Sequence, residues 1–258
     1  MTTTLTSFPA LWSLEPFKAI DGIRSEFQSG AKEITRYPIK YLRYWFVRNF
    51  LEAEAKRLAR PLNVLEVGVD RGQMLAFMGD ASNRERVIGS WTAVDVAPND
   101  PWLSKIGYGE VIQHDVDFGA DPCLHRTFDA VVFLHVLEHL QAPEQTLTTF
   151  LRYVKHDGIV VGGCPTMPSV IADLGYERRL RRKAKPFGHV SVISPERIEQ
   201  FVEAENLHLE FLSGAYLARK QGAWIENFAA WMRLNVAFGA VFPSLGSEVY
   251  FQIRRPVR

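Results

Sequence analysis

Three histidines and one glutamate stand at spacings that suit proton transfer. The segment HVLEHL supplies His135, Glu138 and His139, and the later segment PFGHVSV supplies His189. Residues three and four apart share one face of a helical turn, so positions 135, 138 and 139 can act together. Histidine is the side chain that most readily exchanges a proton near neutral pH. His135, His139 and His189 are therefore candidates for a catalytic base, with a purely structural role as the alternative.

A glycine-bounded turn stands earlier in the chain. It follows the apolar, β-branched run of residues 63–67, and Gly68 and Gly72 allow a ligand to approach backbone N–H groups. Glu66 would repel a pyrophosphate but suits a cationic ligand, and the spacing is not the G-x-G-x-x-G pattern of dinucleotide sites. Asp70 stands in the middle of the turn, where its tolerance of left-handed backbone keeps the interpretation open. The turn predicts a pocket for a cationic, phosphate-free ligand.

Strand-like runs alternate with helical patterns along the chain. We expect strands at residues 63–67, 90–94, 110–113, 128–134, 159–161, 207–212 and 248–253, and helices from about residue 36 to 60, from residue 73, and at 144–154 and 195–205. Such alternation predicts an α/β fold with a doubly wound, mostly parallel sheet. Ligands of these sheets bind beyond the carboxyl ends of the strands, which is where Asp95 and Asp115 stand.

Taken in order, the segments between about residues 63 and 213 resemble the class I S-adenosylmethionine-dependent methyltransferases, in particular an HVLEH-type group that acts on small molecules. The resemblance implies a Rossmann-like sheet of seven strands that ends in an antiparallel hairpin. It also implies S-adenosylmethionine as cofactor, S-adenosylhomocysteine as product, and methyl transfer to an oxygen or nitrogen atom of a small-molecule or glycan-type acceptor. Asp70 departs from the family, which has a glycine at that place.

The resemblance also implies roles for residues at the strand ends. Asp95 would accept both hydroxyls of the ribose, Asp115 would receive the adenine amino group beside the Val116 backbone, and Leu134 and His135 would make main-chain contacts. A helix cap for Asp95 and a plain loop role for Asp115, next to Asp117, are the alternatives. The full set of expected cofactor-binding residues is Glu66, Gly68, Val69, Asp70, Gly72, Asp95, Val96, Asp115, Val116, Leu134 and His135.

The histidine cluster leaves a second interpretation open. His135, Glu138, His139 and His189 resemble the E-x-x-E-H set, with its distant histidine, through which small-RNA 2′-O-methyltransferases and some quinone-pathway O-methyltransferases bind a divalent metal. The first position of that set is glutamate in the family and His135 here, which would make the site richer in nitrogen. The HVLEH sequence is also common in metal-free relatives. We assign no metal ligand from the sequence and keep a divalent metal as the alternative.

Composition and charge argue against several classes of protein. The chain has 258 residues, a net charge of +1 and two cysteines, Cys123 and Cys164, so neither a polyanion-binding bias nor a disulfide framework is indicated. The first residues lack the pattern of a secretory signal, and no long uncharged apolar run suggests a membrane span. We expect a cytoplasmic protein with no nucleic-acid partner and an undetermined oligomeric state.

The expected organisation is an N-terminal arm and helix (residues 1–60) that packs on a methyltransferase domain (residues 61–258). That domain carries an insertion at about 213–247, whose helical segment 224–238 has an apolar stripe that core packing explains best. A basic run at 177–185 could hold a phosphate or carboxylate of the acceptor, with a solvated face as the alternative. Two other functional classes stay open: a nicotinamide-dependent oxidoreductase on a similar fold, and a non-catalytic cofactor-binding module.

Overall fold

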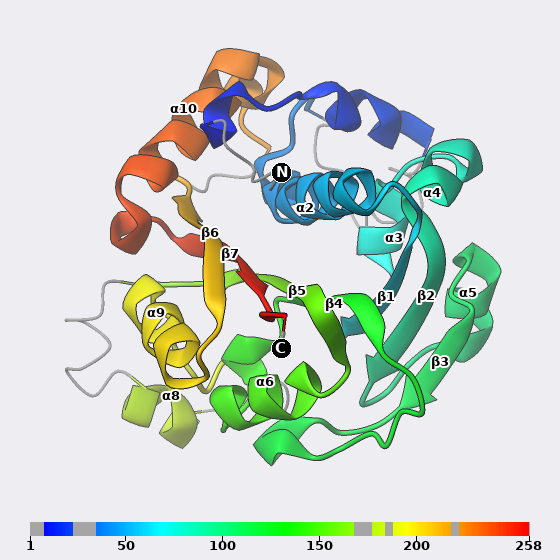
Figure 1. The fold of residues 1–258 in the computed structure, drawn as a ribbon. Helices are drawn as coiled ribbons and strands as arrows, with labels where there is room; N and C mark the ends of the chain where they lie inside the picture. Colours follow the sequence, from blue (N-terminus) through cyan, green and yellow to red (C-terminus); the bar gives the residue numbers. More distant parts are fainter. Residues whose placement is uncertain (1–7, 23–34, 168–176, 184–187, 218–221, 258) are drawn as a thin grey trace.

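The computed structural model describes residues 8–22, 35–167, 177–183, 188–217 and 222–257. In this part of the chain a seven-stranded sheet has the order β3-β2-β1-β4-β5-β7-β6 (Figure 1). The strands are β1 (Leu62–Val67), β2 (Ile88–Asp95), β3 (Glu110–Gln113), β4 (Phe128–Leu134), β5 (Val154–Pro165), β6 (His208–Ala215) and β7 (Glu248–Arg254). Strands β1 to β5 pair in parallel, and β7 is antiparallel to both of its neighbours. The predicted mostly parallel sheet with a closing antiparallel hairpin is confirmed.

Helices cover both faces of this sheet (Figure 1). They are α2 (Leu42–Leu58), α3 (Gln73–Phe77), α4 (Ala81–Val87), α5 (Asp100–Ile106), α6 (Pro143–Leu151), α8 (Glu177–Lys183), α9 (Pro195–Ala204) and α10 (Ala229–Val241). Short 3-10 turns are η1 (Pro9–Leu11), η2 (Glu15–Gly22), η3 (Ile39–Tyr41), η4 (Asp117–Gly119), η5 (Leu137–His139), η7 (Trp224–Asn227) and η8 (Pro243–Leu245). One core lies between the sheet and α2, and a second lies between the sheet and α6 with α9. Because strand side chains alternate, Val64 joins the first core and Leu65 the second.

The N-terminal segment packs against the first core through aromatic side chains. Ile39, Leu42, Phe46 and Phe50 recur at spacings of three and four, and all four are completely buried. Trp12 lies with its ring 5.4 Å from that of Trp45 in α2. The helix ends at Ala59, which adopts left-handed backbone (φ 53°), so the helix stops before Pro61.

The region between α6 and β5 differs from the expected boundaries. Helix α6 ends at Leu151, and Val154, which was expected to be helical, pairs with Phe128 at the start of β5. Residues 156–158 form an irregularity within this long strand, and Asp157 takes a positive φ of 64° there. Arg57 donates a 2.7 Å hydrogen bond to the Asp157 carboxylate, which ties the irregularity to α2. Local periodicity could not show this tie, because the two residues are far apart in the sequence.

The single helix expected at residues 224–238 is divided into two elements, η7 and α10. Phe228 has extended backbone (φ −107°, ψ 123°) and separates η7 from α10. Met232 of the predicted stripe is buried, but Trp224 and Phe228 are exposed, so core packing explains only part of the stripe. Strand β6 also runs on to Ala215, past the expected start of the insertion at residue 213. Among the helices described, none combines the length and apolarity needed to cross a bilayer.

Candidate functional site

An open cleft of about 820 Å³ lies at the carboxyl ends of β1, β2, β3 and β4. The strand order reverses between β1 and β4, which is where parallel α/β sheets bind ligands. The cleft is large enough for a ligand of drug size. Its walls are Gly68, Asp70, Arg71, Val94, Asp95, Val96, Ala97, Asn99, His114, Asp115, Val116, Asp117, His135, Val136, His139, Leu140, Gln141, Gly188 and Val190.

The turn between β1 and α3 depends on left-handed backbone. Gly68 and Gly72 both have φ of +72°, and Asp70 between them has φ of +47°. A Cβ atom at Gly68 would lie 2.2 Å from Val136 Cγ2, so the turn also needs the absence of a side chain there. The expected tolerance of Asp70 for this backbone is confirmed.

Asp95 is already oriented by main-chain groups. Its Oδ2 accepts a 3.1 Å hydrogen bond from the Asp70 N–H, and its Oδ1 accepts a 3.0 Å bond from the Ala97 N–H. A carboxylate has about four lone-pair positions, so two remain available to hydroxyl donors in the cleft. The carboxylate at the end of β2 therefore both holds the turn and can receive a diol.

The two aspartates after β3 have different surroundings. Asp117 Oδ1 accepts hydrogen bonds from the main-chain N–H groups of Phe118 and Gln141, both 2.8 Å long, and so organises the loop. Asp115 is exposed at the cleft wall and accepts one bond, from the Asp117 N–H at 3.0 Å. Its other carboxylate oxygen makes no hydrogen bond with a described residue. Of the two aspartates, Asp115 is the one able to receive a ligand donor.

Four residues expected at the cofactor do not line the cleft, and Glu66 is the most informative of them. Strand alternation turns Glu66 into the first core, where its Oε2 accepts hydrogen bonds from Trp91 Nε1 (3.0 Å) and the Tyr108 hydroxyl (2.6 Å). Burial raises the pKa of Glu66 to about 8, against the opposing effect of those two bonds. This corrects the expectation of a carboxylate that faces a cation, because the group is buried and protonated at neutral pH. The other three are Val69, Gly72 and Leu134, each packed against the first core.

His135 is held between two buried carboxylates. Its Nδ1 lies 3.2 Å from Glu138 Oε1, and its Nε2 lies 3.4 Å from Glu248 Oε1 at the start of β7. Burial lowers the pKa of His135, but the contacts with both carboxylates outweigh it and leave that pKa above its ordinary value. Arg43 of α2 lies 3.2 Å from the same Glu248 oxygen. The environment therefore favours an imidazolium, which is a poor base.

Glu248 and Arg43 are partners of the site that sequence reasoning missed. Glu248 stands directly before the apolar and aromatic residues Val249 to Phe251 of β7, and a completely buried acid at such a place requires a partner. That pattern was a usable signal. Arg43 had no comparable signal, because it stands on a helix with other charged residues and only the fold brings it to β7.

Glu138, His139 and His189 converge at one side of the cleft. Main-chain N–H groups of Val190 (2.8 Å) and Ser191 (3.1 Å) donate to the Glu138 carbonyl, and this docking brings His189 beside η5. The rings of His139 and His189 meet edge to face with centroids 4.9 Å apart. One potential ligand atom from each of the three residues lies within 4.8 Å of the others.

Within the part of the chain that the structure describes, this cluster contains buried polar atoms that lack hydrogen bonds. Both carboxylate oxygens of Glu138 and the Nδ1 atom of His139 are in this position. Glu138 Oε1 stands at ion-pairing distance from His135, but without the direction that a hydrogen bond requires. Buried polar atoms normally have partners, so the cluster is suited to bind a proton, a ligand donor or a divalent cation.

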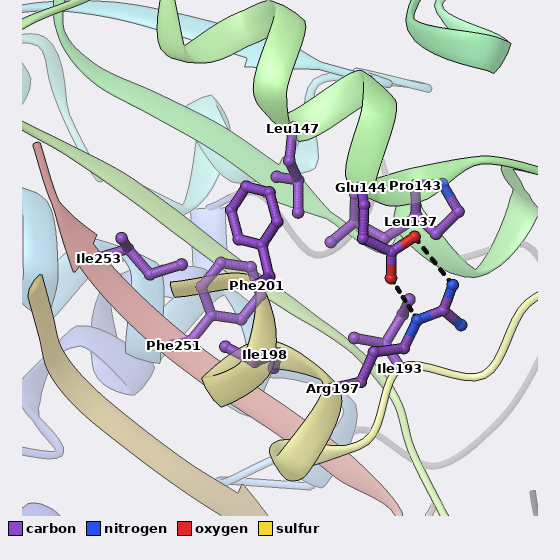
Figure 2. A pocket seen from close by; sticks show the side chains of 10 residues that line it. All are labelled: Leu137, Pro143, Glu144, Leu147, Ile193, Arg197, Ile198, Phe201, Phe251 and Ile253. Atoms are coloured by element: carbon purple, nitrogen blue, oxygen red, sulfur yellow. Dashed lines mark hydrogen bonds and ion pairs between the residues drawn. The ribbon is translucent and has the colours of Figure 1, made fainter. Parts of the chain in front are cut away.

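A second hollow lies behind the cleft, between α6, α9 and β7 (Figure 2). It measures about 10 Å³, which is the space of at most one water molecule, and apolar side chains such as Leu147 and Phe201 line it. Arg197 closes it with a charge-assisted hydrogen bond of 2.9 Å to Glu144 (Figure 2). This hollow belongs to the packing beneath η5 and offers no room for a substrate.

A family profile described as a methyltransferase domain matches residues 39–210. A search of curated protein sequences finds no match. Similar solved structures include a protein from Bacillus halodurans C-125 (14% identity, TM-score 0.53), which covers 81% of this chain and 100% of its own length.

Two further solved structures contain S-adenosylhomocysteine. The plantazolicin methyltransferase BpumL, in complex with a monoazolic desmethylPZN analog and S-adenosylhomocysteine, has a TM-score of 0.53 at 11% identity over 93% of this chain and 89% of its own. The N-methyltransferase NodS from Bradyrhizobium japonicum WM9, in complex with the same nucleoside, has a TM-score of 0.51 at 13% identity over 85% and 89% of the two chains. At these identities the likeness concerns the fold.

Proposed function

We propose that this chain, which belongs to the methyltransferase domain family and is a class I S-adenosylmethionine-dependent methyltransferase, methylates an oxygen or nitrogen atom of a small-molecule or glycan-type acceptor. Membership of the family sets aside the two other classes that the sequence had left open, the nicotinamide-dependent oxidoreductase and the non-catalytic module. The nature of the acceptor is our proposal. The observation that carries it is that one cleft joins the strand-end aspartates to the histidine cluster.

We place the cofactor along the cleft wall formed by β1, β2 and β3. The oriented carboxylate of Asp95 would accept the ribose hydroxyls, and the open oxygen of Asp115 would accept the adenine amino group. The turn at Gly68 would leave room for the methionyl end. Because S-adenosylmethionine carries no phosphate, these carboxylates do not repel it.

His139 is our candidate for the base, supported by His189. Methyl transfer forms a bond from the acceptor lone pair to the methyl carbon while the carbon–sulfur bond breaks and the sulfonium becomes a neutral thioether. The acceptor proton must leave to a nearby group. His139 lines the cleft and is about one-third exposed, whereas His135 is clamped between carboxylates. We therefore assign proton removal to His139 and a positioning role to His135.

A second candidate mechanism uses a divalent cation at Glu138, His139 and His189. The convergence of three donor atoms, and the carboxylate oxygens of Glu138 that accept no hydrogen bond from a described residue, favour it. One carboxylate and two imidazoles suit Zn²⁺, Mn²⁺ or Fe²⁺. A bound cation would polarise an acceptor hydroxyl and lower its pKa. If the wild-type protein stays active after extensive chelation while His139→Ala is inactive, the cation mechanism is rejected and the assignment of His139 as the base stands.

The proposal is tested by calorimetry with S-adenosylmethionine, S-adenosylhomocysteine and NAD. We expect both sulfur nucleosides to bind in the cleft and NAD to give no signal. Acceptors would then be sought by S-adenosylhomocysteine release over a pool of sugars, nucleotide sugars and phenolic or amine metabolites. Cofactor binding without release on any class of small molecule or glycan would contradict the proposed acceptor.

A further inference from the structure

Helix α8 is fixed to the rim of the cleft through one face. Arg181 donates hydrogen bonds to the carbonyls of Gln141 (3.1 Å) and Val190 (3.3 Å), and both of these residues line the cleft. Glu177 accepts hydrogen bonds of 2.7 Å from the Val192 N–H and from Arg197. The position of α8 beside the histidine cluster is therefore set by polar contacts at both of its ends.

Next to these fixed residues, α8 has charges without partners among the described residues. Arg178 and Arg182 are exposed, and neither forms a hydrogen bond or ion pair with the residues that the structure describes. They stand four apart, so their guanidinium groups are neighbours on the helix and repel each other. Together with Glu177 and Arg181 they line an open hollow of about 600 Å³. The Glu177 carboxylate there is already engaged by Val192 and Arg197.

The cleft wall holds Asp70, Asp95 and Asp115, together with Arg71, on the side on which we place the cofactor. On the side of the histidines, Arg181 of α8 bonds to the cleft-lining residues Gln141 and Val190, and Arg178 and Arg182 line the hollow that shares Arg181. A phosphoryl group carries nearly two negative charges and three acceptor oxygens, which matches two neighbouring guanidinium groups better than a single carboxylate does.

We propose that Arg178 and Arg182 bind a phosphoryl group of the methyl acceptor, so that the substrate is a phosphorylated small molecule whose methylated atom reaches His139. This inference rests on the proposed function and names the substrate class of the same cleft. The arginines recognise the part of the acceptor that does not react. The binding energy so gained would align the reacting atom.

The test compares the wild-type protein with the double variant Arg178→Gln/Arg182→Gln. A matched control, Lys56→Gln/Arg86→Gln, removes the same charge from exposed positions outside the cleft wall. Binding of inorganic pyrophosphate, and of acetate as the carboxylate comparator, is measured by calorimetry on protein saturated with S-adenosylhomocysteine. We expect pyrophosphate to bind the wild type and the control alike, at least about tenfold more weakly to the double variant, and acetate not to bind.

Affinity for S-adenosylhomocysteine, measured first on all three proteins, separates the two proposals. If the nucleoside does not bind the wild type, the proposed function fails. If the nucleoside binds equally to all three but pyrophosphate binds the double variant as well as the wild type, or binds none of them, the phosphoryl site alone is rejected. A single-stranded RNA that binds through the same arginines more tightly than pyrophosphate would also overturn the small-molecule acceptor.

Discussion

The two ends of the cleft differ in how completely their polar groups are satisfied. At the end formed by β1 and β2, Asp95 accepts two main-chain hydrogen bonds and holds the turn that contains Gly68 and Asp70. At the other end, Glu138 and His139 have buried polar atoms without hydrogen bonds. The first end is preorganised before any ligand arrives. The second end needs a ligand, a proton or a cation to complete it.

This difference assigns the two ends to two tasks. A preorganised wall suits a cofactor that binds in the same way in every turnover, because no rearrangement is required. An incompletely satisfied cluster suits a step in which a proton moves, because its partners change during the reaction. Changes at the first end should therefore affect affinity or stability, and changes at the second should affect turnover.

The largest expected effect is at the histidine end. His139→Ala and His189→Ala should each reduce methyl transfer by about 100-fold or more, as loss of a general base or its support does, while S-adenosylhomocysteine affinity stays within about twofold. Single-turnover kinetics and calorimetry measure the two quantities. The exposed His156, in β5, is the control, and His156→Ala should retain full activity. Equal losses of S-adenosylhomocysteine affinity and of the methyl-transfer rate would contradict the division of the cleft into a binding end and a reacting end.

Gly68 tests whether the cofactor end depends on steric space. Gly68→Ala should destabilise the protein by about 2–3 kcal/mol, because it adds a Cβ atom against Val136 to a strained left-handed backbone. Gly222 has nearly the same φ, +74°, but no atom of the described residues lies within 4 Å of an added Cβ. Gly222→Ala should cost only the backbone strain, about 1 kcal/mol. Denaturant unfolding measures the stability of both variants. Equal losses of unfolding free energy would show that the contact with Val136 is unimportant.

Substitutions of Asp95 test directly whether its oriented carboxylate binds the ribose hydroxyls. Asp95→Ala should weaken S-adenosylhomocysteine binding at least about tenfold, or about 1.4 kcal/mol, because the diol and the Asp70 N–H both lose their acceptor. Asp95→Asn, which keeps one carbonyl oxygen, should show a smaller loss. Calorimetry at one salt concentration measures both variants. Unchanged affinity in Asp95→Ala would mean that the ribose lies elsewhere.

Substitution of Glu66 should change the free energy of unfolding and leave cofactor affinity unchanged. With its pKa raised from 4.5 to about 8, folded Glu66 keeps a proton that the unfolded chain releases, so stability falls as pH rises between these values. Glu66→Gln keeps an acceptor for Trp91 and Tyr108 and removes this loss, so it should stabilise the protein by at least about 1 kcal/mol at pH 7.5 and by less at pH 5. A marked loss of S-adenosylmethionine affinity in this variant would show that the Glu66 carboxylate does contribute to cofactor binding.

The fold was largely predictable because its signals are local and periodic. Strands β3 and β4 were predicted at their observed bounds, and Asp95 and Asp115 were placed at the cleft from their positions at strand ends. The two failures have different origins. Val154 leaves the helix pattern because of a long-range contact, its pairing with Phe128. Glu66 follows the local alternation of β1 into the first core with Val64, where Trp91 and Tyr108 donate hydrogen bonds to it.

The sequence indicated which residues form the histidine cluster, but it did not indicate how they are arranged in space. Spacing brought Glu138 and His139 together, yet only the docking of Val190 on the Glu138 carbonyl brings His189 to them. The contact of His135 with Glu248 joins the residue that follows β4 to the first residue of β7. Such partners depend on the order of strands in the sheet, which a local pattern does not contain.

A crystal structure with bound S-adenosylhomocysteine tests the central claim most directly. We expect the ribose hydroxyls on Asp95, the adenine beside Asp115, and the sulfur atom oriented toward the side of the cleft that contains His139. A nucleoside bound outside the cleft, or one with its sulfur directed away from the histidine cluster, would contradict the division of the cleft into a cofactor end and a reacting end.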